Sequence, residues 1–146
     1  MNHRKAAVLL LLILIPATSL VALYSYYSVT VGGGPGVVGT EGPCYNVTLV
    51  ISYGKDYGYG INQTFTGLSF PGGTTAFGIL LENTVVNYTY YGSLVLVTGI
   101  NDVFNNVSAN AFWQYYVNGV FGPVASNLYH LSNNSVVVWR YQLSRF

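Results

Sequence analysis

Apolar side chains recur at every second position along much of the chain after residue 43. In residues 44–54, Val47, Leu49 and Ile51 alternate with Thr48, Val50 and Ser52. This is the pattern of a half-buried strand. A weaker strand is predicted at residues 63–70, where it ends before a proline. Further strands are predicted at residues 85–100, as two strands broken at Gly92-Ser93, and at residues 135–143.

Helical spacing occurs in residues 71–84. Phe77, Leu80 and Leu81 fall at i, i+3 and i+4, so they share one face of a helix. A glycine inside this run weakens the helix, which is therefore expected to be short. The candidate N-cap residues are Thr74 and Thr75.

A hairpin is predicted in residues 112–121, where Asn118-Gly119 separates two apolar flanks. The Asn-rich residues 101–111 before it are expected to form a loop. Two strands, a helix and then several strands predict an α+β fold, with one short helix on a mixed or antiparallel sheet. We assign this folded domain to residues 44–146.

Residues 1–28 have the features of a secretion signal or a membrane anchor. Arg4 and Lys5 precede an apolar run, and basic residues stay on the cytoplasmic side of a membrane. As a helix, residues 6–27 would be about 33 Å long, enough to cross a bilayer. We therefore expect a hydrophobic N-terminal helix that anchors the chain in the cell membrane with a single pass.

A second outcome for the N-terminus stays open. Residues 17–19 resemble a cleavage site, and cleavage near Ser19 or Ala22 would release a secreted protein. Apolar residues resume after Ser19, which favours the retained anchor. In both cases the Gly-rich linker at residues 29–43 and the domain after it lie outside the cytoplasm.

The charge content excludes several classes of function. Only 6% of the residues are charged, whereas average proteins carry roughly 25%. Beyond residue 28 the basic residues are Lys55, Arg140 and Arg145, and nucleic-acid binding requires a cluster of such residues. We therefore expect no nucleic-acid partner.

Catalytic and metal-binding groups are equally sparse. His130 is the single histidine after residue 28, and a lone histidine with scattered carboxylates provides neither a metal site nor an acid–base pair. We expect no enzyme activity, no metal and no cofactor. Cys44 is the single cysteine, so it is either a free thiol or half of an intermolecular disulfide. The scattered carboxylates after residue 28, which do not cluster with His130 in the sequence, are Glu41, Asp56, Glu82 and Asp102.

The aromatic residues near the C-terminus divide between two sheet faces. With a period of two, Trp113 and Trp139 are expected in the core under the helix. Gln114, Tyr116 and Arg140 are then left on the open face, with Tyr129 nearby. These four residues are our candidate ligand-binding residues, because such a surface can hold a flat ligand or another protein.

The order of motifs resembles the transcobalamin-like C-terminal domain family of prokaryotic surface proteins. The resemblance covers residues 45–142, and the hairpin at 113–119 is its most specific part. In place of the family's Gly-Asp turn this chain has Asn133-Asn134, which can still form a turn. The matching motifs are Tyr53-Gly54, Gly73-Thr74 through Leu80, Trp113-Gln114-Tyr115-Tyr116-Val117-Asn118-Gly119, Tyr129 with Leu131, and Val137-Val138-Trp139-Arg140-Tyr141.

The resemblance implies a β-grasp-like fold and a corrinoid such as cobalamin as ligand. In transcobalamin and intrinsic factor, the related domain covers one face of cobalamin together with a separate helical domain. We therefore expect a membrane-tethered, extracytoplasmic, non-enzymatic binding domain. The alternative is a structural or adhesive surface protein that assembles with neighbouring surface proteins through its sheet edges.

Sequons for N-glycosylation are frequent in the exported part of the chain. Each consists of an asparagine followed at the second position by serine or threonine. Attached sugars would provide the hydration that charged residues provide in other proteins. The candidate asparagines are Asn46, Asn62, Asn87, Asn106 and Asn133.

Overall fold

The computed structural model describes residue 39 and residues 42–54 and 62–144, so the expected anchor at residues 6–27 lies outside them. Within the described part, no helix has the length and hydrophobicity to cross a bilayer. The elements are β1 (Cys44–Ser52), β2 (Asn62–Phe70), α2 (Ala76–Asn83), β3 (Val86–Tyr91), β4 (Leu94–Ile100), β5 (Val103–Phe104), β6 (Ala111–Val117), β7 (Val120–Phe121) and β8 (Val136–Leu143).

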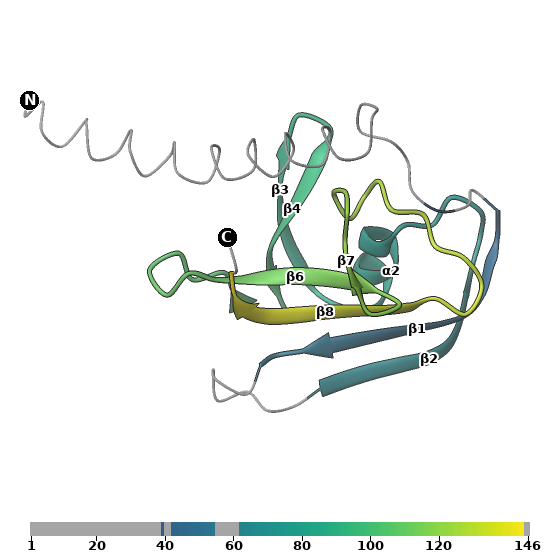
Figure 1. Cartoon of the computed structure of the whole chain (residues 1–146), viewed down its shortest axis with the longest axis horizontal. Helices are drawn as coiled ribbons and strands as arrows, with labels where there is room; N and C mark the ends of the chain where they lie inside the picture. The colour runs from purple at the N-terminus through teal and green to yellow at the C-terminus, as the bar shows by residue number, and fades with distance from the viewer. Residues whose placement is uncertain (1–38, 40–41, 55–61, 145–146) are drawn as a thin grey trace, which may run out of the picture. The chain divides into compact units, whose positions relative to one another are not determined.

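The strands form two sheets (Figure 1). The larger sheet has five strands in the order β2-β1-β8-β6-β7, and the smaller has three in the order β3-β4-β5. In the larger sheet β1 and β8 run parallel, and every other pair is antiparallel. The predicted mixed sheet with one short helix is therefore confirmed at the level of an α+β fold.

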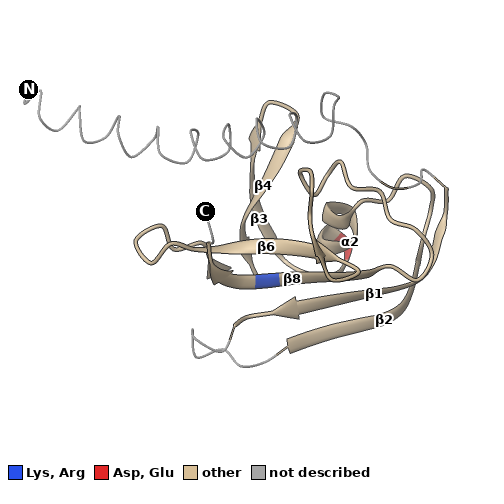
Figure 2. Ribbon diagram, in the orientation of Figure 1, with Lys and Arg blue, Asp and Glu red and all other residues tan. Residues whose placement is uncertain are grey.

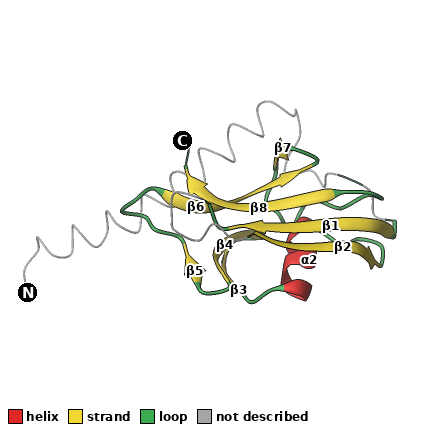
Figure 3. Ribbon diagram, turned by 90° about the horizontal axis from the view of Figure 1, so that it is seen from below, coloured by secondary structure: helices red, strands yellow, loops and turns green. Residues whose placement is uncertain are grey.

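The core lies on one side of the five-stranded sheet. Figure 3 shows α2 and the smaller sheet on this same side. Both tryptophans are buried here as predicted, and their indole N–H groups donate to the backbone oxygens of Val103 and Ala76. Alternate residues of β1, β6 and β8 complete this face: Val47, Leu49, Ile51, Trp113, Tyr115, Val117, Val137, Trp139 and Tyr141.

Helix α2 begins where the sequence predicted it. The side chain of Thr75 accepts a hydrogen bond from the backbone N–H of Gly78 at 3.0 Å, which satisfies one orphan donor of the first turn. Phe77 and Leu80 are buried as expected, but Leu81 is 43% exposed. Ile79 is buried in its place, because the buried face consists of Ala76, Phe77, Ile79 and Leu80 and is rotated about the helix axis away from Leu81.

The prediction of a loop at residues 101–111 was partly wrong, because this segment contains strand β5. Asn101 and Asp102 have φ values of 47° and 65°, and Ile100 pairs with Val103 across them. This is a two-residue hairpin turn in which both central residues have positive φ. Asn–Asp is a weaker signal for this turn than Asn–Gly, since an aspartate tolerates the left-handed region less well than a glycine.

The same turn connects the two sheets through a polar network. The side-chain amide of Asn101 donates to the hydroxyl of Tyr53 at 2.8 Å and to Gln63 Oε1 at 2.9 Å. Its side-chain oxygen accepts a hydrogen bond from the backbone N–H of Val85 at 3.0 Å. These bonds compensate for the unusual backbone conformation and fix the smaller sheet against the end of β1.

Cys44 is the first residue of β1, and its side chain is fully buried. Burial raises the pKa of the Cys44 thiol above its ordinary value of 9.0, although backbone hydrogen bonds partly oppose the shift. The thiol is free in the described structure. A disulfide with a second molecule would require the start of β1 to open.

Native Cys44 is therefore expected to resist a thiol reagent such as 5,5′-dithiobis(2-nitrobenzoic acid) at pH 8 and to react fully in urea. Because the folded pKa lies above the unfolded one, the free energy of unfolding should fall as the pH rises above about 9. Absorbance of the released product measures the reaction, and Cys44→Ala is the blank. Rapid reaction of the native protein would contradict the buried position.

Gly122→Ala is expected to destabilise the protein by about 1–3 kcal/mol, because a Cβ there would overlap the buried ring of Tyr115. That ring is fixed by its hydroxyl, which donates to the backbone oxygen of Val124 at 2.5 Å. The matched control is Gly42→Ala, where a Cβ meets open space. Urea midpoints measure the effect, and equal midpoints for the two variants would disprove the close contact.

Candidate ligand-binding surface

The open face of the five-stranded sheet carries the predicted polar and aromatic residues. In the register of β6 with β8, Gln114 lies opposite Arg140 and Tyr116 opposite Val138. Their neighbours along each strand point into the core, so these side chains point to the other face. In Figure 2 Arg140 is the blue segment of β8. The structure thus brings three of the four predicted residues together.

The centre of this surface is a cation–aromatic contact. The guanidinium carbon of Arg140 lies 5.1 Å from the ring centroid of Tyr116, within the usual range for cation–π attraction. The ring of Phe121 meets Tyr116 edge-on at 5.6 Å. These contacts hold the arginine over a small aromatic platform.

Two glutamines extend the surface along the strands. Gln142 Nε2 donates to Gln114 Oε1 and to the Tyr116 hydroxyl, both at 2.7 Å. The NH₂ group of Gln114 and the carbonyl oxygen of Gln142 have no hydrogen-bond partner among the described residues. The surface therefore offers donors and an acceptor around the aromatic platform.

We call the open-face residues Gln114, Tyr116, Phe121, Arg140 and Gln142 the Tyr116 surface. Gln142 and Phe121 were not among the predicted site residues. A continued period of two from Arg140 would have found Gln142. Pairing across the Asn118-Gly119 turn would have found Phe121, which lies opposite Tyr116.

The charge of Arg140 is not neutralised within the described chain. Arg140 is the one lysine or arginine among the described residues, and Glu82 and Asp102 are the acidic ones. None of these three charged groups forms an ion pair with another described residue. The exposed guanidinium is therefore the main positive charge on the described part of the domain.

The structure does not place Tyr129 on this surface. Its ring meets Tyr115 at 6.2 Å, and Tyr115 belongs to the buried face of β6. Tyr129 therefore packs against the core and cannot contact a ligand held over Tyr116. His130 is a separate case, since its Nδ1 atom is buried and has no hydrogen-bond partner among the described residues.

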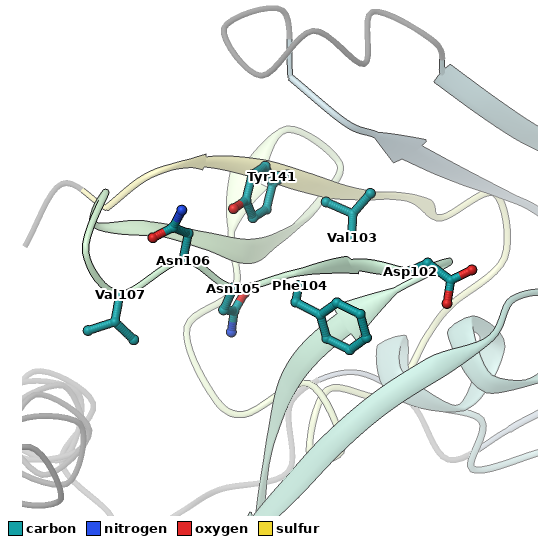
Figure 4. Close-up of a pocket in the computed structure, with 7 residues that line it drawn as sticks. All are labelled: Asp102, Val103, Phe104, Asn105, Asn106, Val107 and Tyr141. Carbon is teal, nitrogen blue, oxygen red and sulfur yellow. The ribbon is translucent and has the colours of Figure 1, made fainter.

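A concave region lies beside β5, away from the Tyr116 surface (Figure 4). It is an open hollow of about 530 Å³. The side chain of Asn105, at its centre, already accepts from Trp113 N at 2.8 Å and donates to Val97 O at 3.0 Å. Asn105 therefore uses both its side-chain oxygen and its amide group in hydrogen bonds to the backbone, which leaves fewer of its polar groups to bind a ligand. The lining residues are Asp102, Val103, Phe104, Asn105, Asn106, Val107 and Tyr141.

The five sequon asparagines all lie at exposed positions. The amide of Asn46 donates to Asn134 at 2.8 Å, and the side-chain oxygen of Asn133 accepts from Tyr45 N at 2.9 Å. Asn62 begins β2 and Asn87 lies in β3, while Asn106 precedes the turn before β6. Their exposure is compatible with glycosylation, which stays a prediction.

Comparison with known proteins supports the fold. Residues 73–143 match the family described as "Domain of unknown function (DUF4430)". No curated protein is similar enough in sequence to count as a match.

Two solved structures share the fold at low sequence identity. A "putative metal binding protein" of Ruminococcus gnavus ATCC 29149 is 13% identical with a TM-score of 0.55, over 68% of this chain and 97% of that chain. Haptocorrin in complex with Cbi is 15% identical with a TM-score of 0.50, over 70% of this chain and 26% of the haptocorrin chain. At these identities the likeness shows the fold alone.

Both kinds of comparison agree with the motifs in the sequence. The family match covers α2 through β8, which includes the hairpin and the closing strand. The described chain therefore has a transcobalamin-like fold, and its residues 73–143 match the DUF4430 family.

Proposed function

We propose that this domain is a non-enzymatic binding module that holds a flat, polar ligand on the Tyr116 surface. The observation that carries the proposal is the Arg140 guanidinium, which is held over the Tyr116 ring at 5.1 Å without an ion-pair partner among the described residues. A ligand placed there would contact the aromatic rings and accept hydrogen bonds from the arginine.

A corrinoid is the ligand class that we infer. Corrinoids combine a flat macrocycle with amide side chains at its edge, and the two glutamines and Arg140 can exchange hydrogen bonds with such amides. Haptocorrin, which has a similar fold, is described in complex with Cbi. This chain spans 26% of haptocorrin, so the proposed ligand contact is that of one domain and not of the whole protein.

The other parts of the proposal rest on the sequence. We infer that residues 6–27 tether the domain to the membrane, that the domain lies outside the cytoplasm, and that its fold is β-grasp-like. The sequon asparagines would carry glycans in a host that performs N-glycosylation. Metal binding finds less support, because the described residues contain no group of three potential ligands from His, Cys, Asp and Glu.

The test is a calorimetric titration of the full chain in detergent micelles with cobalamin and cobinamide. We expect saturable binding with one corrinoid per chain. Arg140→Ala should weaken the affinity by at least about tenfold, because it removes a charge-assisted contact worth roughly 1.5–3 kcal/mol.

Glu82→Ala is the matched control, since it removes an exposed charge from α2, which lies on the other side of the sheet. Its affinity should equal that of the unaltered chain. No heat of binding with either corrinoid, or an equal loss in both variants, would refute the ligand and its site. Circular dichroism of each variant shows whether the fold is intact.

A further inference from the structure

The outermost strand of the larger sheet has one unpaired edge. β2 contains nine residues and pairs with β1 on one side, while no described strand pairs with its other side (Figure 1). At the opposite edge of the sheet, β7 has two residues. The backbone N–H and C=O groups along the outer side of β2 are therefore available to another strand.

The charges and prolines that usually protect such an edge are missing from β2. Natural edge strands carry lysines, other charges or prolines that prevent pairing with a second molecule. β2 has the sequence NQTFTGLSF, which contains none of these. Most of its side chains are exposed, so the strand is not hidden under other parts of the fold.

One feature limits the usable part of this edge. Gly67 has a φ of 66°, and the register with β1 shifts between the pairs Val47↔Leu68 and Leu49↔Phe65. This is a β-bulge, which twists the strand and interrupts the ladder. The register with β1 is unbroken from Asn62 to Phe65, and Thr66 is the last residue before Gly67.

We propose that two copies of this chain pair through the outer edge of β2, in antiparallel orientation about a two-fold axis at Thr64. Residues that face each other across a ladder must point to the same side of the sheet, so the axis passes through a residue. An axis at Thr64 lies within the unbroken run, places Gln63 opposite Phe65, and places Asn62 opposite Thr66.

A second copy is the partner that fits this edge best. The edge is uncharged, and the described domain has few charged groups (Figure 2), so two copies meet little repulsion. The pairing is self-complementary and closes on itself as an isologous dimer. Growth into a filament through the same sheet would need β7, which is too short to offer a comparable ladder.

This inference goes beyond the proposed function. The order of the strands puts β1 between β2 and the strands that carry the Tyr116 surface. Pairing at β2 therefore leaves that surface open in both copies, and it joins the two five-stranded sheets into one continuous sheet.

The test uses cysteine substitutions in the full chain, produced without glycosylation so that Asn62 is bare. Thr64→Cys should form a disulfide-linked dimer when membranes or micelles are treated with copper phenanthroline, because Cβ atoms opposite each other lie about 4.5–5.5 Å apart. Asn62→Cys mixed with Thr66→Cys should give the corresponding mixed dimer. Cys44 is buried and should not contribute.

Val136→Cys is the control, because Val136 is exposed on β8, which lies in the interior of the same sheet. It should yield at least tenfold less dimer than Thr64→Cys. No disulfide dimer with Thr64→Cys, or an equal yield with Val136→Cys, would overturn the proposal.

A second measurement does not depend on oxidation. Native mass spectrometry of the full chain should show a dimer whose share rises with concentration. The double variant Thr64→Lys/Thr66→Lys should be monomeric, since it places like charges opposite one another. A dimer that persists in this variant would also overturn the proposal. Corrinoid binding by the monomeric variant separates this result from the proposed ligand function.

Discussion

The parallel pairing of β8 with β1 is the constraint on which the rest of the structure depends. It places Trp139 beside Ile51, and the antiparallel neighbour β6 adds Tyr115 to the same row. The next row, on the other face, contains Ser52, Arg140 and Gln114. A slip of one residue would exchange the two faces. It would bury the arginine and expose a tryptophan, so the core and the Tyr116 surface are fixed by the same register.

The turn before β8 sets this register. Asn134 has a φ of 60°, and its backbone N–H donates to Tyr45 O at 2.9 Å. Asn133 accepts from Tyr45 N, and Thr48 N donates to Ser135 O at 2.9 Å. The asparagine pair that replaces the family's Gly-Asp turn thus makes the turn and also holds the end of the chain against the start of β1. Local turn chemistry and long-range topology agree here, which favours a single register.

The sequence predicted most features that depend on local pattern. The hairpin at Asn118-Gly119, the cap at Thr75 and the burial of both tryptophans follow from turn preference, capping and a period of two, and all three are present. The same period placed Gln114, Tyr116 and Arg140 on one face. The ligand proposed for them rests on their side chains, because one fold can serve many functions.

The features that the sequence missed depend on contacts between distant residues. Asn101, in the turn that leads into β5, is held by hydrogen bonds to Gln63 of β2, to Tyr53 after β1 and to Val85 before β3. No local sequence pattern predicts this network. Tyr129 was expected near Gln114, Tyr116 and Arg140 on the open face. Its actual contact is with Tyr115, and that contact follows from the path of the loop between β7 and β8.

The low charge of the chain affects both of its open surfaces. On the Tyr116 surface the aromatic and amide groups would make most of the contacts to the proposed ligand, and Arg140 would add the one positive charge. On the β2 edge the absence of charge removes the usual barrier to pairing. Because β1 separates the two surfaces within one sheet, a dimer would present two Tyr116 surfaces on one continuous face. A ligand or partner with two matching groups would then bind both, and its avidity would exceed the affinity of either surface.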